Sequence, residues 1–184
     1  MQPPLTWLIT STTYGTWLPG DRQGFVGRVI EARSDDPLTE HRIEHDRPGT
    51  EYDRDIPALR KSALSLMKGE PILLTPEQAR VVLDQFLETA GHRGWTLHAA
   101  AVMANHFHAI VSAPAALLTE SILRDLKSYA SRALNRTWPK PASETWWTKS
   151  GSRRKLPDDR AVEAAIRYVQ NQHACLALFP EPER

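Results

Sequence analysis

The chain has 184 residues, 41% of them hydrophobic, and a formal net charge of +1, a size and composition that predict one domain, 1–184, with a single core. A single cysteine, Cys175, excludes an internal disulfide and a zinc site built on cysteine pairs. No apolar run approaches the roughly 20 residues of a membrane-spanning helix, and the first residues lack the pattern of a secretory signal. We therefore expect a soluble, cytoplasmic protein with no membrane partner.

The predicted elements begin with a strand and a long polar segment. Residues 5–13 are rich in β-branched and aromatic side chains and predict a strand, which ends in the Gly- and Pro-containing residues 14–20. Between Asp21 and Lys61 there are ten acidic and eight basic residues with few large apolar ones. This composition predicts a long insertion or loop over residues 21–72.

Two helices and a hairpin are predicted next. Thr75 as a cap and Pro76 at the first helical position predict a helix that runs to Gly91. Residues 95–103 and 106–112 predict two antiparallel strands joined by a tight connection. Apolar residues at helical spacing then predict a second helix over residues 119–136.

The last predicted elements are a short strand over residues 146–149 and a helix from the Asp158-Asp159 cap to about His173, followed by a loose tail. The order strand, helix, strand, strand, helix, strand is that of a split βαβ fold. The sequence therefore predicts an α+β protein with a ferredoxin-like antiparallel sheet and helices packed on it.

Two histidines open the second strand of the hairpin, in the segment Asn105-His106-Phe107-His108. Residues two apart on a strand project to the same face, so His106 and His108 should lie side by side, where they could hold one metal ion. Such a short pair also arises by chance, and the alternative is two imidazoles that cap the sheet and bind water. The neighbouring segments have to decide between the two.

Four segments resemble those of the HUH single-tyrosine transposases, specifically the group of REP-associated tyrosine transposases. Residues 103–108 are similar to the signature Met-x-Asn-His-hydrophobic-His, and residues 12–21 to the segment that ends the first strand in one branch of the group. Residues 126–135 resemble the nucleophile helix, and residues 168–172 the end of the C-terminal helix. The segments follow the family's order and span most of the domain outside the polar segment.

The resemblance implies a DNA-binding enzyme that cleaves and rejoins single-stranded DNA associated with hairpins. In the family a tyrosine attacks a backbone phosphate and leaves a 5′-phosphotyrosine link and a free 3′-hydroxyl. A divalent ion, magnesium or manganese, polarises the phosphate. The implied nucleophile is Tyr129 and the implied metal ligands are His106 and His108. The partner is DNA, and relatives include both monomers and homodimers.

One position departs from the family's pattern. Relatives carry a third metal ligand, a glutamine or asparagine, one helical turn after the nucleophile, and the matching Ala133 has no ligand atom. Either water and substrate oxygens complete the coordination shell of the metal ion, or another residue of the chain supplies the third ligand. The candidates for that residue are Asn135, Gln170, Asn171 and His98. Two alternatives stay open: a relative that binds DNA but cleaves it poorly, and a phosphoesterase in which the histidines activate water.

The basic residues are concentrated in one stretch of the chain. Between Arg124 and Lys155 nine basic residues stand against two acidic ones. Cations suit a phosphate backbone, and aromatic rings among them suit unpaired bases. The candidate DNA-binding residues are Lys127, Arg132, Arg136, Lys149, Arg153, Arg154, Lys155, Trp146 and Trp147. A solvated face for the charges, and core positions for the indoles, are the alternative.

Overall fold

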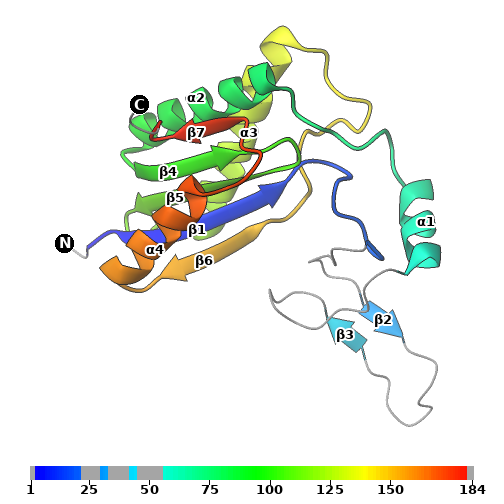
Figure 1. Cartoon of the computed structure of the whole chain (residues 1–184), viewed down its shortest axis with the longest axis horizontal. Helices are drawn as coiled ribbons and strands as arrows, with labels where there is room; N and C mark the ends of the chain where they lie inside the picture. Colours follow the sequence, from blue (N-terminus) through cyan, green and yellow to red (C-terminus); the bar gives the residue numbers. More distant parts are fainter. Residues whose placement is uncertain (1–2, 22–29, 33–41, 45–55, 182–184) are drawn as a thin grey trace.

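A five-stranded antiparallel sheet forms the centre of the protein, with strand order β6-β1-β5-β4-β7 (Figure 1). The computed structural model describes residues 3–21, 30–32, 42–44 and 56–181. The sheet strands are β1 (Leu5–Thr12), β4 (Thr96–Val102), β5 (His106–Ala113), β6 (Ser152–Leu156) and β7 (Ala177–Phe179). The helices are α1 (Pro57–Ser65), α2 (Pro76–Arg93), α3 (Thr119–Thr137) and α4 (Asp159–Gln170), and β2 (Ile30–Ala32) pairs with β3 (Arg42–Glu44). The predicted α+β class and its antiparallel sheet are confirmed.

The helices cover the two faces of the sheet unequally. Phe107 belongs to the larger core under α2 and α3, where its ring lies 4.8 Å from the ring of Phe86. Ile110 belongs to a smaller core that includes Ala165 and Val169 of α4. Figure 1 shows α4 in front of the sheet and α2 and α3 behind it. Because side chains alternate along a strand, the face that carries Ile110 is also the face of the two histidines.

The predicted helix starts are formed by local side-chain caps. The hydroxyl of Thr75 accepts from the backbone N–H of Gln78, and the Gln78 side chain accepts from the backbone N–H of Thr75, which makes a capping box for α2. The carboxylate of Asp158 accepts from the N–H of Ala161 at 2.8 Å and caps α4. These contacts satisfy N–H groups that have no partner inside the helix.

The predictions for the last third of the chain need correction. Residues 146–149 do not form the last strand, because Trp147 makes only an isolated bridge with Thr13. The strand is β6, which pairs with β1 and carries three consecutive cations, a composition that an edge strand tolerates because one of its sides faces solvent. The tail predicted as loose contains β7, which pairs with β4.

In the described part of the polar segment over residues 21–72 the chain forms the helix α1, which the sequence pattern does not predict. Most of the segment before α1 lies outside the described residues, so the predictions of an insertion there and of one domain over 1–184 stay predictions. Among the described residues, no helix combines the length and the hydropathy that a membrane crossing requires.

Candidate active site

The two histidines lie side by side at one end of β5. In the pairing of β1 with β5, Thr12 stands opposite His106 and Thr10 opposite His108. The ring centroids of the histidines are 5.0 Å apart, with an angle of 82° between the ring planes. His108 is 7% exposed, and His106 is half-buried. The site is therefore a pair of converging imidazoles at the end of a core-facing row.

Each histidine is oriented by a hydrogen bond to its Nδ1 atom. The Nδ1 of His106 lies 2.7 Å from the side-chain oxygen of Asn105, which accepts its proton. The Nδ1 of His108 lies 2.7 Å from the hydroxyl of Thr10. Within the described part of the chain, neither Nε2 atom makes a hydrogen bond. Metal-binding histidines are oriented in this way, with one ring nitrogen held by the protein and the other left for the ion.

Burial keeps the histidines in the form that binds metals. Burial, and in second place the repulsion from a charge on the neighbouring His106, lower the pKa of His108 to about 4. Burial also lowers the pKa of His106. Both rings are thus neutral near pH 7, and neutral imidazole is the metal ligand. In the described ranges no third His, Cys, Asp or Glu completes a cluster, so a divalent ion held here needs oxygen ligands from an amide, water or substrate.

Tyr168 of α4, rather than Tyr129, contacts the histidines. The ring centroid of Tyr168 lies 5.4 Å from that of His108, and 51% of Tyr168 is exposed. Tyr168 is thus packed on His108 and open to solvent at once, with an apolar ring face and an exposed hydroxyl.

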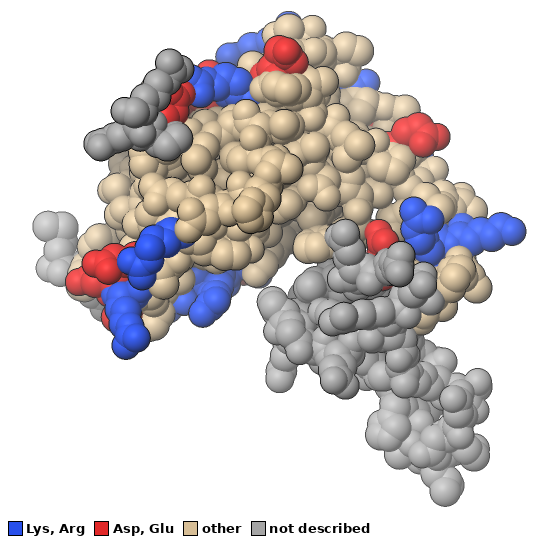
Figure 2. Space-filling model, in the orientation of Figure 1, with Lys and Arg blue, Asp and Glu red and all other residues tan. Residues whose placement is uncertain are grey.

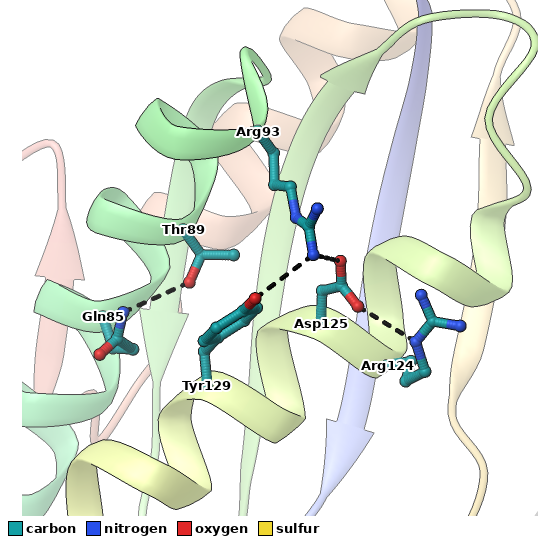
Figure 3. Close-up of polar contacts among 6 residues, drawn as sticks. All are labelled: Gln85, Thr89, Arg93, Arg124, Asp125 and Tyr129. Carbon is teal, nitrogen blue, oxygen red and sulfur yellow. Dashed lines mark hydrogen bonds and ion pairs between the residues drawn. The ribbon is translucent and has the colours of Figure 1, made fainter.

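Tyr129 lies on α3, behind the sheet in the view of Figure 1. Its hydroxyl accepts from Arg93 at 3.4 Å, and the guanidinium groups of Arg93 and Arg132 lie 5.8 and 5.1 Å from its ring centroid. Figure 3 shows it between α2 and α3, beside the ion pair of Arg93 with Asp125. Within one chain the sheet separates Tyr129 from the histidine pair, so the geometry does not support its expected role.

The residues expected as a third ligand are dispersed. Asn135 of α3 accepts from the indole of Trp146 at 2.8 Å, again behind the sheet, where Ala133 is also buried. His98 bonds to Ser112, six positions along β5 from His106 and about 20 Å away at the usual rise of a strand.

Gln170 and Asn171 are exposed at the end of α4, two and three positions after Tyr168. At about 100° per residue, this offset turns Gln170 to the opposite side of the helix from Tyr168. The residue one turn after Tyr168 is Gln172, whose side-chain amide donates to the Tyr168 carbonyl at 3.0 Å. Sequence reasoning missed Tyr168 and Gln172, although their spacing is that of a nucleophile and a ligand one turn later.

The expected DNA-binding indoles are core residues. Trp146 is 6% and Trp147 is 3% exposed, and both belong to the larger core. The indole N–H of Trp147 donates to the Lys127 carbonyl and to the Ser131 hydroxyl, each at 3.1 Å. Neither ring is placed as an open stacking platform, because the segment after α3 buries both of them against α3.

The expected basic residues are spread over both faces of the sheet. Lys127 is mostly buried, and its ammonium donates to the carbonyls of Thr148 and Ser150, the second at 3.1 Å. Arg132 and Arg136 lie on α3, and Lys149 is exposed in the segment after it.

The three cations of residues 153–155 lie on β6 rather than on a loop. Arg153 pairs with Glu120 at 2.9 Å, whereas Arg154 stands opposite Leu8, on the histidine face. Lys155 stands opposite Trp7, on the other face. Figure 2 shows Lys and Arg interspersed with Asp and Glu at the lower left of the histidine face, where α4 and β6 lie, and a largely uncharged surface beside them.

Comparison with known families decides where the chain belongs. The model of the family described as IS200-like transposases matches residues 67–172, more than half of the chain. The chain belongs to this family. The matched region contains the histidine pair, Tyr129 and Tyr168, and the predicted membership among the single-tyrosine transposases is confirmed.

A search of curated proteins finds no match for this IS200-like transposase. Among solved structures it is similar to a REP-associated tyrosine transposase bound to a REP hairpin, with 11% identity and a TM-score of 0.47. That match covers 91% of this chain and 66% of the other, so the chain spans less than two thirds of that transposase. It is also similar to a transposase candidate from Deinococcus radiodurans R1, with 14% identity, a TM-score of 0.47 and 95% of each chain covered.

Proposed function

We propose that this IS200-like transposase cleaves and rejoins hairpin-associated single-stranded DNA through a covalent bond to Tyr168. The observation that carries the proposal is the packing of the Tyr168 ring on His108, on the face of the sheet that holds both histidines. In this proposal the nucleophile is Tyr168 and not Tyr129, because a nucleophile and the group that polarises its target must reach the same phosphate.

The proposed step exchanges one phosphate ester for another. The phenolate oxygen of Tyr168 bonds to the phosphorus, and the bond from phosphorus to the 3′ oxygen breaks. The phenol proton of Tyr168 is lost to solvent, the released 3′ oxygen takes up a proton and becomes the 3′-hydroxyl, and the 5′ phosphate stays on the tyrosine. Attack by a 3′-hydroxyl reverses the step and rejoins a strand. The ester bond energy is conserved, so the reaction needs no nucleotide cofactor.

The donor atoms at the site fit a divalent cation, magnesium or manganese. His106 and His108 would bind it through Nε2, because Asn105 and Thr10 hold their Nδ1 atoms. Bound there, such an ion supplies a Lewis acid for the scissile phosphate. The two imidazoles favour manganese by ligand preference.

Gln172 is the proposed third ligand, through its side-chain oxygen. It stands one helical turn after Tyr168, which is the spacing that the family resemblance implies between nucleophile and third ligand. Its side-chain amide nitrogen donates a hydrogen bond to the Tyr168 carbonyl, so the amide oxygen is the atom left to bind the metal ion. With Tyr168 as nucleophile, the lack of a ligand atom at Ala133 no longer matters.

A matched pair of variants tests the proposal. The chain is incubated with a labelled single-stranded hairpin oligonucleotide and Mn²⁺, and denaturing gels reveal a covalent protein–DNA adduct. We expect the adduct from the unmodified chain and from Tyr129→Phe, and none from Tyr168→Phe. Its loss in Tyr129→Phe, with Tyr168→Phe unaffected, would overturn the assignment. No adduct from any chain with DNA still bound favours a binding protein, and product release by Tyr168→Phe at full turnover favours a phosphoesterase.

A further inference from the structure

A pocket of about 460 Å³ lies beyond the end of β1, and one of its lining residues, Trp17, also stacks on His106. We name it the indole pocket, and its lining includes Trp17, Trp147, Leu18, Met67, Lys127 and Lys149. The residues come from the turn after β1, from the segment that follows α1 and from α3 with the segment after it. A cavity of this size is in the range of sites that bind small organic molecules.

The pocket and the histidines are joined by short contacts. The ring of Trp17 stacks against His106, with centroids 6.5 Å apart and 21° between the planes. The carbonyl of Asn105, next to His106, accepts from the N–H of Thr13 at 2.9 Å and from the hydroxyl of Thr16 at 3.2 Å. The turn that carries Trp17 is therefore fixed to the strand end that carries the histidines.

The lining of the pocket combines flat apolar walls with positive charge. Trp17 is 39% exposed, and Leu18 and Met67 add apolar surface. The Trp147 wall is apolar because its indole N–H is satisfied by Lys127 and Ser131. An aromatic ring joined to an anion is the ligand chemistry that uses both features.

The two ammonium groups differ in their freedom. The Lys127 ammonium is held between the carbonyls of Thr148 and Ser150. Lys149 is exposed at the rim and can follow a phosphate. Inorganic phosphate alone would make no use of the indoles, and an apolar ligand would make no use of the lysines, whereas a nucleotide uses both.

We propose that the indole pocket receives one unpaired nucleotide of the DNA strand next to the phosphate bound at the histidine pair. Its base packs on Trp17 and its phosphate lies near Lys149. This inference rests on the proposed function for the identity of the strand, but it concerns binding and requires no cleavage. In this proposal Trp17 is a residue that positions DNA.

The test measures binding without metal, so that no strand is cut. Fluorescence anisotropy follows the binding of fluorescein-labelled dodecathymidylate to the full chain in EDTA. We expect Trp17→Leu to weaken binding about tenfold, and Trp17→Phe, which keeps an aromatic face, to weaken it less. Trp138→Leu is the matched control, because Trp138 is half-buried at the end of α3 and does not line the pocket. Thermal melting of each variant checks that it folds.

The charge contribution is tested by salt dependence. Lys149→Ala should reduce the slope of log affinity against log salt by about 0.7, the value of one phosphate contact on a single strand. Lys140→Ala is the matched control, because Lys140 is exposed and does not line the pocket. This substitution should leave the slope unchanged. No binding by the unmodified chain, or equal affinity of the folded Trp17→Leu and Trp138→Leu variants, would overturn the inference.

The outcomes separate this inference from the proposed function. If Mn²⁺ produces the Tyr168 adduct while Trp17→Leu binds DNA like its control, the pocket inference fails and the function stands. If Trp17→Leu weakens binding while the unmodified chain forms no adduct, the function fails and the pocket inference stands.

Discussion

The stability of the protein should depend on pH through Lys127. Burial lowers the pKa of this ammonium from 10.5 to about 8. The unfolded chain therefore binds more protons than the folded chain between about pH 8 and pH 10.5. The free energy of unfolding rises with pH in that window, because it rises wherever the unfolded state binds more protons. From about pH 7.5 to about pH 10 the gain is at most about 2 kcal/mol, since one pKa unit corresponds to about 1.4 kcal/mol.

Urea unfolding of the unmodified chain and of Lys127→Met, each at about pH 7.5 and about pH 10, measures this gain in the free energy of unfolding. The other ionisable groups are common to the two proteins and cancel in the difference. We expect the unmodified chain to gain about 2 kcal/mol over the variant as the pH rises. The exposed Lys140→Met should follow the unmodified chain. Parallel pH profiles for the unmodified chain and Lys127→Met would refute the reasoning.

Two further predictions concern the metal site and the turn after β1. Thr10→Val removes the hydrogen-bond partner of His108 and should weaken Mn²⁺ binding, measured by calorimetry, about 10- to 100-fold; unchanged affinity would speak against the orienting role of Thr10. Gly15→Ala should lower the free energy of unfolding by about 2–3 kcal/mol, and Gly94→Ala by about 1 kcal/mol. Both glycines have positive φ, but of the two only Gly15 has neighbours that a Cβ would meet: the end of the Met67 side chain, which can move, and the backbone Cα of Pro71 at 3.1 Å, which cannot move easily. Equal losses would contradict the packing argument.

Local pattern predicted much of the fold. The alternation of apolar residues along β5 correctly indicates that Phe107 is buried and that His106 and His108 share a face. The Thr75 and Asp158 caps correctly indicate the starts of α2 and α4, because capping depends only on residues within one turn.

The assignment of faces depends on tertiary structure and was harder to predict. Tyr129 and Tyr168 both stand on helices with an apolar stripe, so periodicity does not separate them. Right-handed crossovers in the order βαββαβ put α2 and α3 on one face of the sheet. The uninterrupted apolar row on β5 that starts at Phe107 is the row that two helices bury, so the histidine row faces α4. That combination, with the spacing from Tyr168 to Gln172, would have led to the proposal of Tyr168 from the sequence alone.

The order of the last strand escaped prediction for another reason. Trp146 and Trp147 have strong strand propensity but are buried as a loop under α3, while the cations of β6 form an edge strand. Propensity describes a half-buried pleated surface, and one exposed edge can override it.

The identity of the residue that bonds to DNA tests the central claim most directly. The covalent adduct of the unmodified chain with a labelled single-stranded oligonucleotide is digested with trypsin and nuclease, and mass spectrometry locates the nucleotide-bearing tyrosine. The histidine-face geometry predicts the modification on Tyr168, in the peptide that follows Arg167. Modification of Tyr129 instead would contradict it.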